Sequence, residues 1–220
     1  RIAVVVSPNN PTSLLVPKAE LVRLLKKLAD HNCMLIVDES FIDFAENGES
    51  ESLENDIGDF QNLAIVKSMS KAYGICGIRI GYLLTANANF RAEVQQGLHI
   101  WNINGFAEEF LRRVPRYVEQ FKTSCKKVRE DRDEFYTLLS DIPGMVVYKP
   151  AANYIFCRLP DSGPSAPEVT ERLFVEHNIY IKHCQGKTLP ESGRYVRIAS
   201  RTKKENLELT QSLRSVLESV

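Results

Sequence analysis

A short segment of the chain gathers residue types that could carry out covalent chemistry. It contains Lys67, Ser68, Ser70 and Lys71, and Arg79 follows eight residues after Lys71. A lysine amine that is kept partly neutral can form an imine with a carbonyl compound. The hydroxyls of the serines and the planar donor fork of Arg79 are suited to a phosphate group. Together these residues predict a nucleophilic lysine beside an anion site, although each alone is typical of a solvated surface.

Two upstream motifs could serve the same site. Asp38 follows an apolar run at 33–37, just as Ser68 follows another at 63–67. In open α/β sheets, ligands bind beyond the carboxyl ends of the strands, so these residues should lie near one another. Asn10 lies in a turn-forming cluster of serine, prolines and asparagines. The simpler interpretations are that Asp38 caps a helix and that Asn10 forms an Asx turn.

These motifs resemble, in their order along the chain, those of the class I/II aminotransferases, which carry pyridoxal 5'-phosphate. Residues 68–82 are similar to the family signature S-x-S-K-…-G-x-R-x-G-Y. Asn10 and the residues after it resemble N-P-T-G, with Ser13 in place of the glycine. Residues 37–44 resemble the family motif D-E-A-Y/F. The resemblance therefore covers the first part of the chain with three separate motifs.

The second half of the chain continues the resemblance. Residues 101–108 are similar to the W/F-x-V-N-x-x-A-E/Q stretch of histidinol-phosphate aminotransferases and threonine-phosphate decarboxylases, with Asn104 as its asparagine. Asn153 stands in an A/T-N-F/Y motif, and Arg197 stands in the R-I-A/S strand. For Asn104 an equally weighted alternative is the capping of a helix. These two groups of enzymes are the most similar branch of the family.

The resemblance implies a role for each matching residue. Lys71 would form an imine with pyridoxal 5'-phosphate and move the proton at the substrate α-carbon, while Asp38 would keep the pyridine nitrogen protonated. The other implied cofactor contacts are Asn10, Phe41, Ser68, Ser70 and Arg79, and the implied substrate contacts are Asn104, Asn153 and Arg197. No metal site is expected, because the cysteines and histidines lack the spacing of metal ligands.

Three functions remain open at this point. The first is an aminotransferase that acts on an amino acid or a phosphorylated amino compound, with a 2-oxo acid as its second substrate. The second is a decarboxylase of a phosphorylated amino acid, which Phe41 favours because many family members have tyrosine there and some threonine-phosphate decarboxylases have phenylalanine. The third is a non-catalytic regulatory or interaction domain, against which the retention of Lys71, Asp38 and Arg197 argues.

The pattern of apolar runs and turns predicts an α/β fold in two domains. Residues 1–115 are expected to form the C-terminal part of a cofactor-binding large domain with a mainly parallel, three-layer sheet, and residues 116–220 a small α+β domain. The expected strands lie at 2–6, 33–37, 63–67, 79–84, 145–148, 153–159, 179–182 and 195–199. The expected helices lie at 17–31, 166–177 and 203–218, with helical structure from 86 to 140 broken near 102–105 and at Pro115. The acidic stretch at 45–61 is expected to be a surface excursion.

Composition narrows the class of protein. Twenty-eight basic and 28 acidic residues balance, so no net charge favours nucleic acid or an anionic membrane. No apolar run approaches the roughly 20 residues of a membrane span. The five scattered cysteines are expected to be reduced and mostly buried, as in a cytoplasmic protein. Because the family fold is longer and this sequence opens within a strand, we expect a missing N-terminal part, weak cofactor binding by the isolated chain, and a homodimer.

Overall fold

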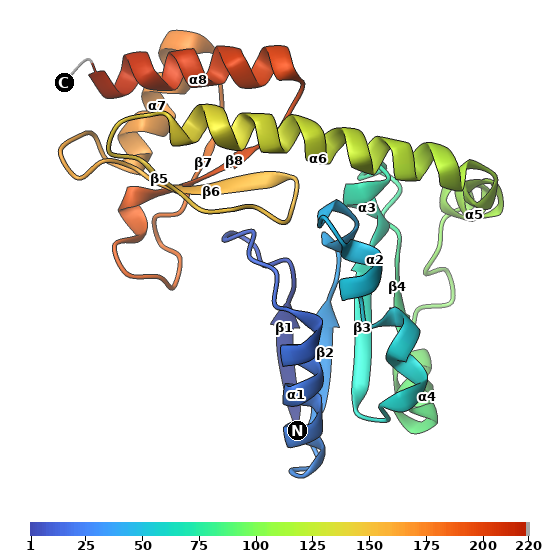
Figure 1. Ribbon diagram of the computed structural model, residues 1–220. Coiled ribbons are helices and arrows are strands. Elements are labelled where there is room, and N and C mark those ends of the chain that lie inside the picture. The colour runs from blue at the N-terminus through green and yellow to red at the C-terminus, as the bar shows by residue number, and fades with distance from the viewer. Residues whose placement is uncertain (219–220) are drawn as a thin grey trace. The chain divides into compact units, whose positions relative to one another are not determined.

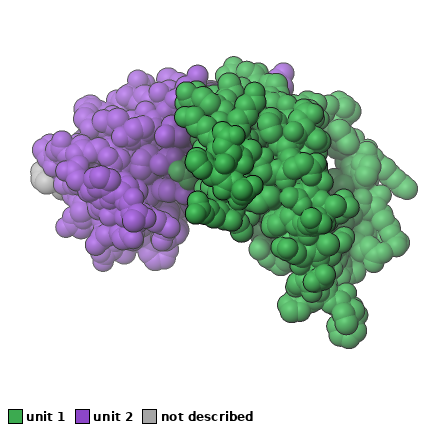
Figure 2. All heavy atoms as spheres, turned by 90° about the horizontal axis from the view of Figure 1, so that it is seen from below, with its two compact units in different colours: residues 1–9, 15–125 green, residues 10–14, 126–220 purple. Residues whose placement is uncertain are grey.

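The computed structural model describes residues 1–218, which fold into two compact units. Unit 1 comprises residues 1–9 and 15–125, and the described part of unit 2 comprises residues 10–14 and 126–218. Figure 2 shows the two units in different colours. The sequence-based division after residue 115 stays a prediction; in the compact units, residues 116–125 belong with the first.

Unit 1 is built on a four-stranded sheet in the order β1-β2-β3-β4 (Figure 1). The strands are β1 (Ile2–Val6), β2 (Met34–Asp38), β3 (Leu63–Ser68) and β4 (Gly81–Leu84). The first three strands are parallel and β4 runs antiparallel to β3. Because β2 and β3 point the same way and are paired, Asp38 and Ser68 lie at the same edge of the sheet.

One face of this sheet is covered by α1 (Lys18–Ala29), which lies along β1 and β2 in Figure 1. Leu21 and Leu25 of the helix pack on alternate strand residues, because successive side chains of a strand point to opposite faces. Each such fully buried leucine stabilises the fold by roughly 1.5–3 kcal/mol. On edge strand β1 the alternate residues Ile2 and Val4 are exposed.

The connections in unit 1 are mostly short helices. They are the 3₁₀ helices η1 (Ile42–Phe44), η2 (Glu54–Asp59) and η3 (Val114–Tyr117) and the α-helices α2 (Gly48–Glu51), α3 (Met69–Ala72), α4 (Ala88–Gly97) and α5 (Gly105–Arg113). The stretch expected to be a surface excursion therefore carries α2 and η2, and Leu53 within it is fully buried. The expected helix breaks near 102–105 and at Pro115 are confirmed.

Unit 2 contains a second sheet, antiparallel throughout, in the order β5-β6-β8-β7. Its strands are β5 (Val146–Val147), β6 (Tyr154–Arg158), β7 (Lys182–His183) and β8 (Tyr195–Ala199), with η4 (Ser192–Arg194) before β8. Its helices are α7 (Ala166–His177) and α8 (Lys203–Glu218). The strand expected at 179–182 was misplaced: only Lys182 and His183 pair with β8, while Ile181 enters the core.

Helix α6 (Val118–Ser140) supplies residues to both units. Its C-terminal half contributes Phe135 and Leu139 to the core of unit 2, together with the apolar faces of α7 and α8. All five cysteines are free and four are buried, as expected from the sequence. No helix within residues 1–218 is long and apolar enough to cross a membrane. The same residues contain no cluster of three histidine, cysteine or acidic side chains that could hold a metal ion.

Candidate functional site

The carboxyl ends of β2 and β3 are joined by a chain of hydrogen bonds in unit 1. The Asp38 carboxylate accepts the backbone N–H of Ser40 at 2.9 Å, and the Ser40 hydroxyl accepts the backbone N–H of Ser68 at 2.9 Å. Asp38 is half-buried and Ser40 is buried. A carboxylate held in this way is a strong acceptor for a protonated ring nitrogen, because charged hydrogen bonds are shorter and stronger than neutral ones.

Ser68, Ser70 and Arg79 form a group of donors directly beyond β3. The Ser68 hydroxyl caps α3 by accepting the backbone N–H of Ser70 at 3.3 Å. Nη1 of Arg79 lies 3.4 Å from the Ser70 hydroxyl oxygen and donates at 3.0 Å to the carbonyl of Cys76. Arg79 itself is exposed, so the rest of its guanidinium remains available to an anion. Two hydroxyls and a guanidinium in this arrangement suit a phosphate group.

The backbone around Arg79 is held in an uncommon conformation. Arg79 has φ of 60°, in the left-handed region that costs a non-glycine residue roughly 1–2 kcal/mol. Such strain persists where the surrounding structure imposes it, often at functional sites. Gly81 is required by space, because a Cβ there would lie 2.6 Å from the Lys67 carbonyl oxygen. Gly77, by contrast, has open space around it, so no close contact requires a glycine there.

Lys71 lies exposed on α3, a helix that is anchored by its other residues. Met69 is buried in a cluster with Ile80 and Ala107. Tyr73 stacks on Phe121 with ring centroids 4.1 Å apart and an interplanar angle of 10°. The side chain of Lys71 is therefore exposed to solvent while its backbone is held in an anchored helix, an arrangement that leaves the amine accessible to a ligand.

A half-buried network of charged groups supports the same strand ends. Lys67 donates to Asp43 at 3.0 Å and lies 3.5 Å from Glu54, which also accepts the Tyr82 hydroxyl proton at 2.5 Å. Burial opposes the charge on Lys67, but Asp43 and Glu54 outweigh it, so the pKa of Lys67 is raised. Burial and the bond to Glu54 raise the pKa of Tyr82. The network fixes η1 and η2 against β3 and β4.

Glu39 is a fully buried carboxyl in this region and is 1% exposed. It accepts the Ser52 hydroxyl proton at 2.5 Å and the Leu53 backbone N–H at 2.9 Å. Burial raises its pKa above the ordinary value, and these hydrogen bonds act in the opposite direction. Glu39 and Asp43 thus both hold neighbouring elements in place through their side chains.

Phe41 is buried two residues after Glu39 and is the N-cap residue of η1. Its ring provides no hydroxyl at the position where the family motif has tyrosine or phenylalanine.

Asn104 uses both ends of its side-chain amide within unit 1: its oxygen caps α5 by accepting the Ala107 N–H, and its nitrogen donates to the Ile78 carbonyl. The capping interpretation of Asn104 is observed, and its contact with a substrate stays a prediction.

Unit 2 brings Asn10 and Arg197 together although 187 positions separate them in the sequence. Nη1 of Arg197 donates to the side-chain oxygen of Asn10 at 2.9 Å. The guanidinium also lies over the ring of Tyr154, 5.2 Å from its centroid, which is a favourable position for a cation. Arg197 is half-buried and thus held by two contacts, with its remaining donors suited to a carboxylate.

Ser13 explains the departure from the glycine of the N-P-T-G motif. It has φ of 59°, the conformation that glycine adopts at no steric cost, and it is completely buried. Its hydroxyl accepts the backbone N–H groups of Ala151 at 3.1 Å and Ala152 at 2.8 Å. These bonds tie the Asn10 turn to the segment before β6, where the half-buried Asn153 lies.

Lys182 is an additional cation beside Arg197. The two residues face each other in the register of β7 and β8, so their side chains stand on the same face of the sheet. Lys182 is exposed. A ligand held by Arg197 through one anionic group would therefore find a second positive charge within reach.

The structure groups the predicted site residues within each unit. Unit 1 holds Lys71, Asp38, Phe41, Ser68, Ser70, Arg79 and Asn104, and unit 2 holds Asn10, Asn153 and Arg197. Sequence reasoning missed the connecting residues Ser40 and Ser13 and the second cation Lys182. A serine in place of the alanine or glycine of a motif was the available signal for the first two. No signal in the sequence indicated Lys182, because only the register of β7 and β8 shows that it lies beside Arg197.

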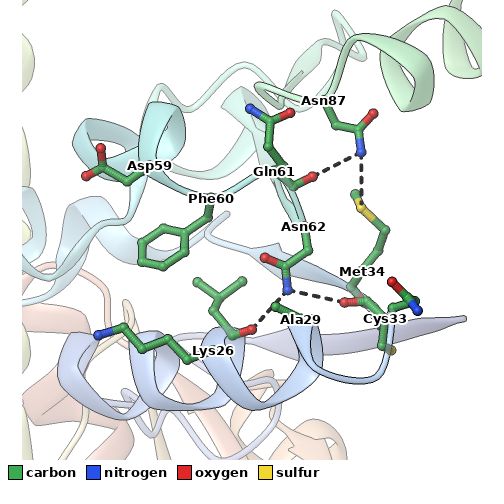
Figure 3. Close-up of a pocket in the computed structure, with 11 residues that line it drawn as sticks. Lys26, Ala29, Cys33, Met34, Asp59, Phe60, Gln61, Asn62 and Asn87 are labelled. Atoms are coloured by element: carbon green, nitrogen blue, oxygen red, sulfur yellow. Dashed lines mark hydrogen bonds between the residues drawn. The ribbon is translucent and has the colours of Figure 1, made fainter.

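A cavity of about 500 Å³ lies at the opposite ends of β2 and β3. Figure 3 shows the Asn62 amide in it, donating to the carbonyls of Leu25 and Cys33, and the Asn87 amide donating to that of Gln61. These bonds satisfy backbone groups that would otherwise lack partners, which is a structural task. None of the predicted site residues lines this cavity.

Comparison with known proteins adds independent information about the chain. A family model described as aminotransferase class I and II matches residues 1–213. The CMP-5'-(3-aminopropyl)phosphonate synthase of Streptomyces rubellomurinus is 42% identical over 204 residues, covering 93% of this chain and 32% of that protein. The L-serine phosphate decarboxylase of Sulfurospirillum multivorans is 34% identical over 220 residues, covering 98% of this chain and 55% of that protein.

The fold has close counterparts among solved structures. The histidinol-phosphate aminotransferase from Clostridium acetobutylicum superimposes with a TM-score of 0.91 at 28% identity, over 100% of this chain and 64% of that one. The expected α/β fold class is confirmed. The chain spans between about a third and a little over half the length of the curated relatives it matches.

Proposed function

Because this chain belongs to the class I and II aminotransferase family, we propose that it forms part of a pyridoxal-phosphate enzyme that acts on an amino acid carrying a phosphate or phosphonate group. Family membership confirms the resemblance deduced from the motifs. The observation that carries the proposal is the arrangement in unit 1, where Asp38, Ser68, Ser70 and Arg79 are linked at one edge of the sheet. That edge also carries Lys71 on α3.

The residues of unit 1 fit pyridoxal 5'-phosphate in charge and in hydrogen-bonding type. Asp38 would pair with the pyridine nitrogen and keep it protonated, while Ser68, Ser70 and Arg79 would bind the phosphate. The bound cofactor would supply an electron-accepting ring that stabilises negative charge at the substrate α-carbon. Lys71 would hold the cofactor and afterwards carry the proton to or from that carbon.

Unit 2 supports the choice of substrate class. Arg197, held by Asn10 and Tyr154, would bind the substrate carboxylate through two parallel hydrogen bonds. Lys182, its neighbour in the strand register, would attract a second anionic group of the substrate. Relatives named for serine phosphate and for an aminopropylphosphonate agree with a substrate that carries a phosphate or phosphonate group.

The reaction is proposed to be decarboxylation, with transamination as the second candidate. The sequence alone placed transamination first. The order changes because the L-serine phosphate decarboxylases of Sulfurospirillum multivorans and Campylobacter jejuni are 34% and 33% identical to this chain. The buried Phe41 also lacks the hydroxyl that a tyrosine would offer the cofactor oxygen. A histidinol-phosphate aminotransferase from Carboxydothermus hydrogenoformans, at 29% identity, keeps transamination as the alternative.

The first test is the visible absorption spectrum of the whole protein with added pyridoxal phosphate, beside Lys71→Ala. We expect an absorption band in the wild type that the variant lacks. The absence of a band in both proteins would refute the cofactor proposal and favour the non-catalytic interaction domain.

The second test distinguishes the reactions. O-phospho-L-serine is supplied with and without a 2-oxo acid, and carbon dioxide and amino-group transfer are measured. Release of carbon dioxide without the 2-oxo acid supports decarboxylation, whereas amino-group transfer that requires the 2-oxo acid supports transamination.

Lys182→Met should weaken the preference for O-phospho-L-serine over L-serine, and an unchanged preference would remove Lys182 from the substrate site.

Self-association is also proposed. Ile100 and Trp101, on the segment that links α4 to α5, are each 93% exposed, and Phe106, in the first turn of α5, is 84% exposed. Clusters of exposed apolar side chains of this kind mark contact surfaces, and a second copy of the protein is the proposed contact. Sedimentation at several protein concentrations tests whether the protein forms a homodimer. The cytoplasmic location stays a prediction.

A further inference from the structure

We propose that Ser40 is a positioning residue, which couples the Asp38 end of the cofactor site to its Ser68–Ser70 end. The proposal rests on the proposed function, because it concerns how this chain holds a phosphate-bearing cofactor. It goes beyond the predicted site residues, in which Ser40 has no part.

The geometry at the strand ends places a side chain where a backbone acceptor would normally lie. The last regular bond between β2 and β3 runs from the Glu39 N–H to the Val66 carbonyl at 2.9 Å. After Asp38 the chain leaves the sheet and turns into η1. The next N–H of β3, that of Ser68, is accepted at 2.9 Å by the hydroxyl of Ser40.

Ser40 thus makes two hydrogen bonds, one toward each end of the site. Its backbone N–H donates to the Asp38 carboxylate, and its hydroxyl accepts from the backbone of Ser68. Alanine, the residue of the family motif at this position, would keep the first bond and lose the second. The hydroxyl is therefore not needed for the fold of the family, and its contribution here is a fixed spacing between the two ends of the site.

The consequence of losing the hydroxyl should appear at the phosphate end. Ser68 caps α3 and accepts the N–H of Ser70, whose hydroxyl lies 3.4 Å from Arg79. Without its acceptor, the Ser68 N–H would be left without a protein partner in a partly buried place, and the backbone there would shift to find water. The hydroxyls of Ser68 and Ser70 would move with it.

The test compares the affinities of the whole protein for pyridoxal phosphate and for pyridoxal, which lacks the phosphate. For Ser40→Ala we expect roughly a three- to tenfold loss of affinity for pyridoxal phosphate, the range for one lost hydrogen bond, with little change for pyridoxal. Ser40→Thr retains the oxygen and should restore most of the difference. Ser50→Ala, which removes an exposed hydroxyl on α2, should change neither affinity.

Each result separates the two proposals. Equal losses for both ligands in Ser40→Ala, or no loss for either, would overturn the positioning role while leaving the proposed function intact. A wild-type protein that binds neither ligand would overturn the proposed function and this proposal with it. A drop in unfolding temperature of the ligand-free variant without a change in the affinity ratio would reduce Ser40 to a structural residue and overturn the proposal.

Discussion

The two units of this chain hold their predicted site residues in different ways. In unit 1, Asp38, Ser68 and Ser70 are linked through backbone N–H groups at the ends of two parallel strands. In unit 2, Arg197 is held by the side chains of Asn10 and Tyr154, one from a turn and one from a neighbouring strand. The first arrangement depends on the secondary structure at the ends of neighbouring strands, and the second depends on contacts between segments that are distant in the sequence.

This difference matches the two tasks proposed for these groups of residues. A cofactor that stays bound needs a rigid site, and hydrogen bonds from strand ends and a helix cap provide it. A substrate that binds and leaves needs a cation whose donors remain partly free, and a side-chain pair provides that. Substitutions at the linked strand ends of unit 1 should therefore affect stability and cofactor binding, whereas substitutions at Arg197 should affect substrate binding.

The largest effect is expected for Lys67→Met in unit 1. It removes the cation that pairs with Asp43 and Glu54, and it leaves two carboxylates close together in a mostly buried place. Breaking such a pair from one side should lower the free energy of unfolding by about 3 kcal/mol. Urea unfolding of the variant measures the loss, with the exposed Lys27→Met as the control. A loss no larger than that of the control would show that the network is not structural.

The next effect is expected for Arg197→Lys in unit 2. Lysine lacks the planar fork and cannot keep both the Asn10 bond and a two-bond grip on a carboxylate. We expect about 2 kcal/mol of lost substrate binding, roughly a 30-fold higher KM, with an unchanged cofactor absorption band. The exposed Arg201→Lys is the control. Loss of the cofactor band in Arg197→Lys would contradict the assignment of Arg197 to the substrate.

Ser13 gives a smaller effect whose two parts can be separated. Ser13→Ala removes the acceptor of two N–H groups while keeping the strained φ, and should cost about 1.5 kcal/mol of stability. Ser13→Gly loses the same bonds but relieves the left-handed strain, so it should be more stable than Ser13→Ala by about 1 kcal/mol. Thermal unfolding of both variants checks the order, and the reverse order would refute the strain argument.

The smallest effect is a pH dependence from Glu39. Burial raises its pKa above the ordinary value of 4.5. A carboxyl with a raised folded-state pKa contributes stability that is complete below the unfolded-state pKa and is lost as the pH rises through the folded-state pKa. The wild type should therefore lose stability relative to Glu39→Gln as the pH rises from about 4.5. Urea unfolding at several pH values measures this, with Glu49→Gln at an exposed position as the control; a pH-independent difference would contradict it.

Much of the fold could be predicted from the sequence because its signals are local. The β-branched run at 2–6 and the apolar runs at 33–37 and 63–67 became strands β1, β2 and β3 with bounds within about one residue. The break between α4 and α5 follows from the residues at 102–105, where Asn104 supplies a cap. These elements depend on periodicity and capping, which a few neighbouring residues determine.

The elements that were misplaced depend on distant partners. The strand expected at 179–182 shrank to Lys182 and His183, because pairing with β8 rather than apolar content decides where β7 lies. The acidic stretch at 45–61 was expected on the surface, yet Glu39 and Leu53 draw it into a buried contact. The partners, β8 for β7 and Glu39 for Leu53, cannot be predicted from the residues of the two segments themselves.

The sequence by itself determined the identity of the family, because the matching motifs consist of residues that are neighbours in the chain, as at Ser68, Ser70 and Lys71. Only the tertiary structure decided which residues connect those motifs. Ser40 reaches Ser68 across 28 positions, and Ser13 reaches Ala152 across 139. A hydrogen bond forms wherever folding brings a donor and an acceptor together, and the spacing of residues along the chain does not record that meeting.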